Sequence, residues 1–137
     1  MTVATTTGRD QGGPNILIVD DSVMMRAMIK RVAAVAGPPI GTIFEAANGQ
    51  DALAILEAHP IHFVFTDLNM PVMTGTELLR AMKARDEWRG IVRVIISTDG
   101  SDSRRLEAED LAVALYVEKP FRPEVMRDVL ASITPAP

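Results

Sequence analysis

Short hydrophobic runs rich in β-branched residues alternate along this chain with longer segments whose apolar residues recur at helical spacing. Runs of this kind are typical of strands buried on both faces, and the helical spacing indicates amphipathic helices. We therefore predict strands at residues 16–19, 42–46, 62–66, 91–96 and 115–117, and helices at residues 22–36, 50–59, 76–85, 101–111 and 123–133. The apolar stripe of the first helix ends at Val35, and the buried stripe of the last helix begins at Val125.

The order of these elements limits the fold strongly. A helix between two consecutive strands makes a right-handed crossover, so the strands run parallel and helices cover both faces of the sheet. The chain therefore predicts an α/β fold with a doubly wound, five-stranded parallel sheet of the flavodoxin-like type, in strand order 2-1-3-4-5. Residues 1–14 are rich in Thr and Gly and lack the apolar core of a signal peptide. We predict a flexible tail there, one folded domain at residues 15–134 and a short C-terminal tail at residues 135–137.

Residues able to carry chemistry follow four of the five predicted strands. They are, in chain order, Asp20, Asp21, Asp67, Ser97, Thr98 and Lys119. The carboxyl ends of parallel strands lie along one edge of the sheet, which is where such sheets bind ligands. We therefore expect three carboxylates, a hydroxyl and an ammonium in a single site.

This combination points to phosphoryl chemistry on an aspartate. Gathered carboxylates repel one another unless a cation lies between them, and Mg²⁺ favours one or two carboxylates together with water and phosphate oxygens. Asp67 is the candidate nucleophile, because a carboxylate can accept a phosphoryl group, and Lys119 can meet a phosphoryl oxygen as a point charge. Ser97 and Thr98 are both candidate hydroxyl donors. Each of these residues alone has an ordinary structural role, such as a helix cap, a turn or a solvated lysine, and only the combination favours the site.

The composition excludes several other classes of function. The net charge of -4, without a block rich in Lys and Arg, argues against nonspecific binding to nucleic acid or to a membrane surface. The chain has no cysteine, which excludes disulfides, thiolate metal sites and a cysteine nucleophile. Its apolar stretches are shorter than the roughly 20 residues of a membrane span. We expect a cytoplasmic protein with no nucleic-acid partner and no membrane insertion.

Taken together, the motifs resemble those of response-regulator receiver domains. They are Val19-Asp20-Asp21-Ser22, Asp67-Leu68-Asn69-Met70-Pro71 with Gly75, Ile96-Ser97-Thr98, and Glu118-Lys119-Pro120-Phe121. The resemblance covers residues 15–133 and implies the (βα)5 receiver fold. Within the family the chain is most similar to the chemotaxis type, through Asp21-Ser22, Met25-Arg26 and Ser97-Thr98-Asp99-Gly100.

The resemblance implies a phosphorylation site with a bound metal. Asp67 would be the phosphoacceptor. Mg²⁺, for which Mn²⁺ can substitute, would bind Asp20, Asp21, Asp67 and the backbone carbonyl of Asn69. Lys119 would contact the phosphoryl group.

The resemblance also implies a switch. Ser97 would be the switch hydroxyl, with Thr98 as its neighbour, and Tyr116 would be the aromatic switch residue. Asn69 and Asp99 match positions that influence how fast the acyl phosphate hydrolyses, and these two residues imply a short phosphoryl lifetime.

The implied function is a stand-alone response regulator of a two-component phosphorelay. It would be no enzyme beyond its own phosphoryl transfer and dephosphorylation. Its partners would be a sensor histidine kinase, a downstream protein bound through the surface at residues 101–133, and a phosphatase. A phosphorelay intermediate and a kinase-scaffold receiver are alternatives within the family. A phosphatase of the haloacid dehalogenase type fits less well, because Asp20 is not followed two residues later by a second Asp, and a flavodoxin would need a phosphate loop where Asp20 and Asp21 stand.

Overall fold

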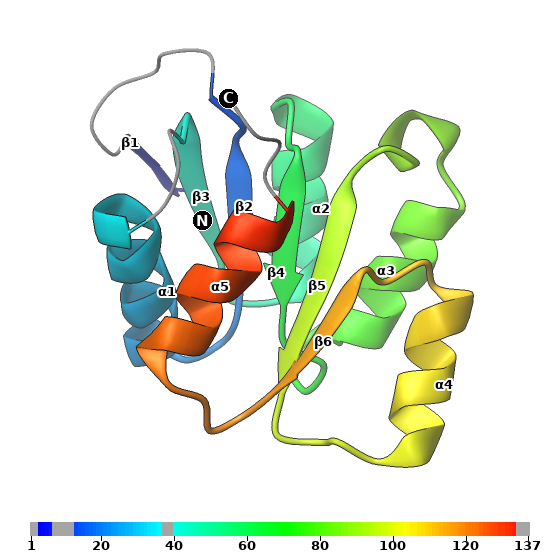
Figure 1. Ribbon diagram of the computed structural model, residues 1–137. Coiled ribbons are helices and arrows are strands. Elements are labelled where there is room, and N and C mark those ends of the chain that lie inside the picture. Colours follow the sequence, from blue (N-terminus) through cyan, green and yellow to red (C-terminus); the bar gives the residue numbers. More distant parts are fainter. Residues whose placement is uncertain (1–2, 7–12, 37–39, 134–137) are drawn as a thin grey trace.

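Strands and helices alternate through most of the chain in the computed structural model, which describes residues 3–6, 13–36 and 40–133 (Figure 1). The elements are β1 (Val3–Thr6), β2 (Ile16–Val19), α1 (Val23–Ala36), β3 (Thr42–Ala46), α2 (Gly49–Ala58), β4 (Phe63–Thr66), α3 (Gly75–Lys83), the 3₁₀ turn η1 (Asp86–Trp88), β5 (Val92–Ser97), α4 (Asp102–Asp110), β6 (Leu115–Glu118) and α5 (Pro123–Ile133). Every predicted strand and helix is present, with ends shifted by no more than one or two residues.

The sheet has the predicted topology. Its strand order is β1-β3-β2-β4-β5-β6, and the strands from β3 to β6 are parallel. Counted as the five predicted strands, this is the order 2-1-3-4-5. Helices α1 and α5 cover one face, and α2, α3 and α4 cover the other (Figure 1). None of the helices in the described part of the chain has the length and hydrophobicity needed to cross a membrane.

The sheet also contains a sixth strand, β1, which the sequence analysis did not predict. Residues Val3–Thr6 pair antiparallel with β3, from Val3 opposite Glu45 to Thr6 opposite Thr42. The edge of β3 offers unpaired backbone groups, and Val and Thr are good strand formers, so the pairing is physically reasonable. The predicted flexible tail is therefore corrected at these four residues. The rest of that segment up to residue 12, residues 37–39 and the predicted C-terminal tail lie outside the described residues.

The core forms two layers because the central strands are buried on both faces. In β2, Leu17 and Val19 pack with α2 and α3, whereas Ile16 and Ile18 pack with α1 and α5. The strands β4 and β5 alternate in the same way, which explains their continuous hydrophobic runs.

The two predicted helix stripes need correction at their ends. Val35 is 80% exposed and Val125 is 40% exposed, and Met126 is buried in place of Val125. Both residues satisfy the helical period, but the buried residues nearest to them are Ala33 on α1 and Met126 on α5.

Candidate functional site

Backbone hydrogen bonds beyond the regular strands bring the predicted site residues together. The N–H of Asp20 donates to the carbonyl of Ala46, and the N–H of Asp67 donates to the carbonyl of Val19, at 3.0 and 2.9 Å. The N–H of Lys119 donates to the carbonyl of Ser97 at 2.8 Å. Each residue is thus fixed to the end of the neighbouring strand. The polar residues at the ends of β2, β4, β5 and β6 therefore lie at one edge of the sheet.

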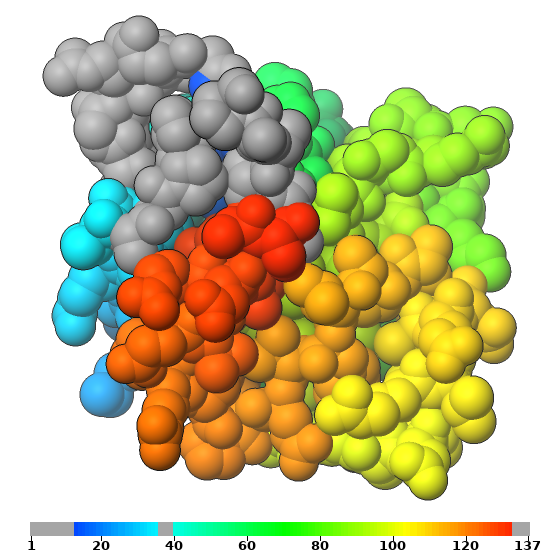
Figure 2. Space-filling model, viewed as in Figure 1, coloured from blue at the N-terminus to red at the C-terminus, as the bar shows by residue number. Residues whose placement is uncertain are grey.

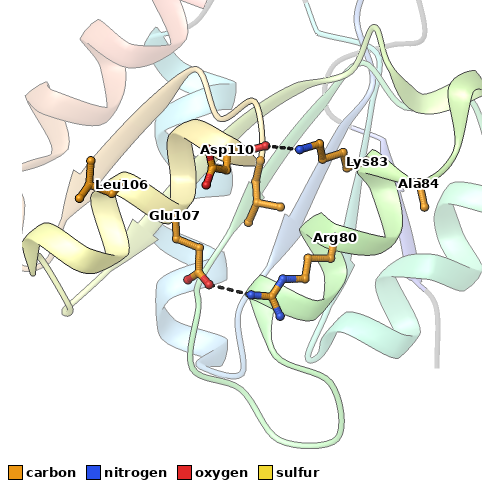
Figure 3. Close-up of a pocket in the computed structure, with 7 residues that line it drawn as sticks. Arg80, Lys83, Ala84, Leu106, Glu107 and Asp110 are labelled. Carbon is orange, nitrogen blue, oxygen red and sulfur yellow. Dashed lines mark hydrogen bonds and ion pairs between the residues drawn. The ribbon is translucent and has the colours of Figure 1, made fainter.

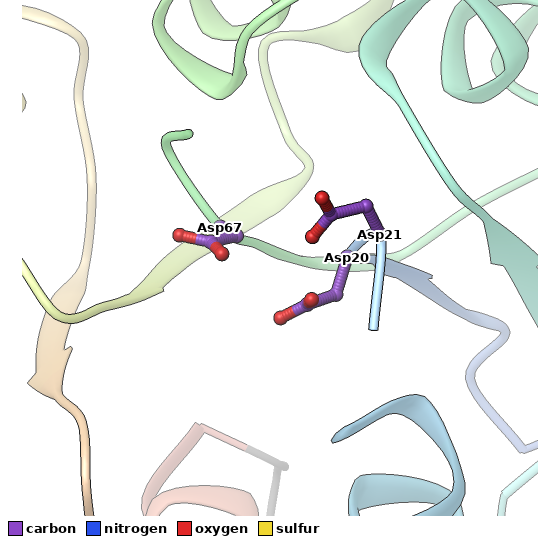
Figure 4. Close-up of side chains that lie close together, drawn as sticks. All are labelled: Asp20, Asp21 and Asp67. Carbon is purple, nitrogen blue, oxygen red and sulfur yellow. The ribbon is translucent and has the colours of Figure 1, made fainter. Parts of the chain in front are cut away.

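Three carboxylates meet at this edge. An oxygen from each of Asp20, Asp21 and Asp67 lies within 4.8 Å of the others (Figure 4). Asp20 is 2% exposed and Asp67 is 9% exposed, while Asp21 is open to solvent. The predicted acidic cluster therefore forms, with two buried members and one at the surface.

Lys119 lies against the two buried carboxylates. Its Nζ is 2.8 Å from Oδ2 of Asp20 and 3.1 Å from Oδ2 of Asp67. Burial raises the pKa of Asp20, and the hydrogen bonds from Lys119 and from the Ser22 N–H offset this only in part. Burial lowers the pKa of Lys119, but its contacts with Asp20 and Asp67 outweigh burial, and the net shift is upward. Lys119 is therefore charged at neutral pH, and its peptide bond to Pro120 is cis.

The loop after β4 holds Asp67 closely. Oδ1 of Asp67 accepts a hydrogen bond from the N–H of Leu68 at 2.7 Å and a weak one from Asn69 at 3.5 Å. Gly75 approaches so closely that a Cβ there would stand 1.9 Å from the carbonyl oxygen of Asp67. Val72 has a φ of 69°, which is unfavourable for a β-branched residue. The loop therefore needs Gly75 and carries some backbone strain beside the site.

The structure separates the two candidate hydroxyls. Ser97 is fully buried at the end of β5, whereas Thr98 is exposed. The Oγ of Ser97 accepts a hydrogen bond from the N–H of Asp99 at 3.1 Å. The hydroxyl of Tyr116, a half-buried side chain on β6, donates to the carbonyl of the same Asp99. Ser97 and Tyr116 therefore both form hydrogen bonds with the backbone of Asp99, at the start of the loop before α4.

Two arginines that the sequence analysis did not single out surround this loop. Nε of Arg104 lies 3.4 Å from Oδ2 of Asp99. The guanidinium of Arg105 stacks over the Tyr116 ring at 4.6 Å and lies 3.1 Å from Oε1 of Glu118. A pair of adjacent arginines at the start of a polar helix was the only available signal, and the chain alone does not show which side chains they reach.

Among the surface grooves of the described residues, one lies between α3 and α4 and another along β6 and α5. The first separates α3 from α4, where Arg80 pairs with Glu107 at 2.8 Å and Nζ of Lys83 donates to the carbonyl of Asp110 at 2.7 Å (Figure 3). The second runs along β6 and α5, on the face turned toward the viewer in Figure 2. It is lined by Leu115, Tyr116, Val117, Glu118, Pro120, Phe121, Arg122, Val125 and Val129.

The residues at the sheet edge fit a magnesium ion. The cluster offers hard carboxylate oxygens and no nitrogen or sulfur ligand, which is the donor set that Mg²⁺ prefers. Exposed Asp21 leaves room for the several waters that Mg²⁺ keeps. The part of the backbone carbonyl of Asn69 in such a site stays a prediction.

Comparisons with known proteins agree with this geometry. A family model described as the response regulator receiver domain matches residues 16–131. The chemotaxis protein CheY of Pseudomonas aeruginosa is 35% identical over 118 residues, covering 86% of this chain and 94% of that protein. The chemotaxis protein CheY1 of Helicobacter pylori is 33% identical over 116 residues, covering 84% and 92%. Among solved structures, the chemotaxis response regulator CheY4 of Vibrio cholerae has a TM-score of 0.79 at 28% identity, covering 88% of this chain and 98% of that one. From its sheet, its acidic edge and these relatives, the chain belongs to the response-regulator receiver domain family.

Proposed function

We propose that this protein is a chemotaxis-type response regulator in which Asp67 accepts a phosphoryl group from a histidine kinase. The observation that carries the proposal is the meeting of Asp20, Asp21, Asp67 and Lys119 at one sheet edge in a receiver domain. Receiver domains of this kind are signalling proteins, and the chemistry proposed here is confined to the protein's own aspartate.

In the proposed reaction, a carboxylate oxygen of Asp67 forms a bond to phosphorus. The bond to the donor imidazole breaks, its electron pair stays on the leaving nitrogen, and that nitrogen takes up a proton. Bound Mg²⁺, held by Asp20, Asp21 and Asp67, would neutralise charge on the transferring phosphoryl oxygens. Lys119 is placed to exchange its contact with Asp67 for one with a phosphoryl oxygen, because it already reaches both buried carboxylates.

The proposed switch acts through Asp99. The N–H of Asp99 donates to Oγ of Ser97, and the Tyr116 hydroxyl donates to the carbonyl of Asp99. A shift of the Ser97 hydroxyl toward a phosphoryl group on Asp67 would break the first hydrogen bond and, by moving Asp99, weaken the second. Tyr116 would then be free to turn inward, and the loop before α4 would move. The helix itself is weakly anchored, since Ala108 is its only buried residue in the described chain. A local change of charge would thus alter the surface of a loosely packed helix.

The proposed output is the binding of a protein partner to the surface at residues 101–133. The groove along β6 and α5 lies within this surface and contains the switch residue Tyr116. It also carries the half-buried Phe121 and the exposed Val125, which can supply apolar contact area at its centre. A change in the position of the Tyr116 side chain would therefore directly alter the contacts and the affinity of a bound partner.

Loss of the phosphoryl group belongs to the same proposal. Asn69 is exposed two residues after Asp67, and the N–H of Asp99 donates to Oγ of Ser97. Asn69 and Asp99 can therefore influence the access of water to the acyl phosphate. A phosphatase is a further proposed partner. We place these events in the cytoplasm, because histidine kinases draw their phosphate from ATP.

The test is intact-mass measurement after incubation with acetyl phosphate and Mg²⁺. We expect one phosphoryl adduct, which disappears when EDTA is added beforehand and is missing in Asp67→Asn. Ser97→Ala should still accept phosphate but lose the phosphorylation-dependent gain in partner affinity. An adduct that persists in Asp67→Asn, with folding unchanged by circular dichroism, would contradict the proposed acceptor. A parent protein that gives no adduct and does not bind beryllofluoride would contradict the proposed function.

A further inference from the structure

Asp20 is held through its main chain as well as through its carboxylate. Its N–H donates to the carbonyl of Ala46, and its own carbonyl accepts a hydrogen bond from Nη1 of Arg26 on α1. Its carboxylate oxygens accept from the N–H of Ser22 and from Lys119, each at 2.8 Å. Lys119 therefore contacts Asp20 where a metal would bind, whereas Arg26 contacts it from behind.

Arg26 is itself fixed by Glu45 on β3. Its Nε lies 3.0 Å from Oε1 of Glu45, and Nζ of Lys30, one turn further along α1, lies 2.9 Å from Oε2. The side chains of Arg26 and Glu45 are only 15% and 18% exposed. Burial raises the pKa of Glu45, but the hydrogen bonds from Lys30 and Arg26 outweigh it, and the pKa is below its usual value. An ionised Glu45 therefore braces the guanidinium in the position from which it reaches Asp20.

We propose that Arg26 is a positioning residue of the acidic site, which fixes the main chain of Asp20 and so aims its carboxylate at a divalent cation. The inference rests on the proposed function, since it requires the cluster to bind Mg²⁺. Groups that orient metal ligands from behind typically change metal affinity about 10- to 100-fold when they are removed.

The sign of the effect separates positioning from simple electrostatics. Arg26 is a cation in contact with the main chain of Asp20, so its charge alone opposes the binding of a metal cation by the Asp20 carboxylate. Removal of Arg26 would then strengthen Mg²⁺ binding if charge were its only contribution. Positioning predicts weaker binding.

The experiment measures the Mg²⁺ dissociation constant of the whole chain by calorimetric titration. We expect Arg26→Met to raise the dissociation constant about tenfold, as for other groups that orient metal ligands. Lys30→Met is the matched control, because Lys30 contacts Glu45 without contacting Asp20, and its dissociation constant should stay close to that of the parent. Arg26→Lys keeps the charge but cannot serve Asp20 and Glu45 together, so it should lie between the parent and Arg26→Met.

Urea unfolding in EDTA supplies the second readout. If Arg26→Met folds and binds Mg²⁺ as tightly as the parent or more tightly, the inference is overturned, whatever stability the variant has lost. If Arg26→Met does not fold, Arg26→Lys and Glu45→Gln decide, and unchanged dissociation constants in both overturn it. Normal Mg²⁺-dependent phosphorylation of the parent alongside either result leaves the proposed function standing. A parent that binds no Mg²⁺ overturns the proposed function and the inference together.

Discussion

Replacing Lys119 with methionine removes the positive charge that Asp20 and Asp67 share. Nζ lies 2.8 and 3.1 Å from the two carboxylates, and the side chains of Lys119, Asp20 and Asp67 are 12%, 2% and 11% exposed. At an effective dielectric constant of about 20, each attraction amounts to roughly 5–6 kcal/mol before desolvation. Desolvation of the ammonium opposes this, and removing one partner of a buried ion pair costs about 3–5 kcal/mol in practice. Because Asp21 opens the edge to water, we expect a loss near the lower end, about 3 kcal/mol, in the absence of Mg²⁺.

Urea unfolding followed by far-ultraviolet circular dichroism measures this loss in EDTA and again in Mg²⁺. Without the ammonium a Mg²⁺ ion meets no positive charge of Lys119 at Asp20 and Asp67, so the variant should bind Mg²⁺ more tightly. The difference in stability between parent and variant should therefore narrow in Mg²⁺. Arg89→Met is the control, since its pair with Asp86 is 79% and 89% exposed and its loss should change stability by less than about 0.5 kcal/mol. A Lys119→Met protein as stable as the parent in EDTA would refute the reasoning, because desolvation of the ammonium would then cancel its attraction to the carboxylates.

Three further predictions follow from local geometry. Gly75→Ala should lower the free energy of unfolding by about 2 kcal/mol and impair phosphorylation, since its Cβ would meet a rigid backbone oxygen; Gly90→Ala, with nothing within 4 Å, is the control, and equal losses would contradict this. The depressed pKa of Glu45 gives stability that is present above its unfolded value of 4.5 and lost as the pH falls through the folded value. Urea unfolding should therefore show a gap between the parent and Glu45→Gln at neutral pH that closes in acid, and a gap independent of pH would count against it. Burial, with help from Asp99, raises the pKa of Tyr116, the only tyrosine, so ultraviolet titration should give a midpoint above 10, and a midpoint at or below 10 would be inconsistent with this environment.

The strand ends were predictable because a parallel sheet leaves little freedom there. Once β2, β4, β5 and β6 are placed in order, their carboxyl ends must share an edge, and Asp20, Asp67, Ser97 and Lys119 must meet. The choice between Ser97 and Thr98 was not available from spacing alone. β5 ends at Ser97, so Thr98 lies just beyond the strand, and only the folded chain shows that Ser97 is the buried hydroxyl of the two.

The supporting contacts were beyond prediction from the sequence. The bond from Arg26 to Glu45 joins residues on two different elements, and the stack of Arg105 on Tyr116 does the same. Hydrophobic and turn patterns carry no information about which charged side chains meet across elements. The strand β1 was missed for a related reason, because four residues without clear alternation acquire a strand conformation only from the open edge of β3.

The central claim is that Asp67 itself carries the phosphoryl group. The most direct measurement is to phosphorylate the protein with acetyl phosphate and Mg²⁺, reduce the acyl phosphate with borohydride, and locate the resulting homoserine by tandem mass spectrometry. The account predicts homoserine at position 67 and unmodified aspartates at positions 20 and 21. Homoserine at position 20 or 21 with none at position 67 would contradict it.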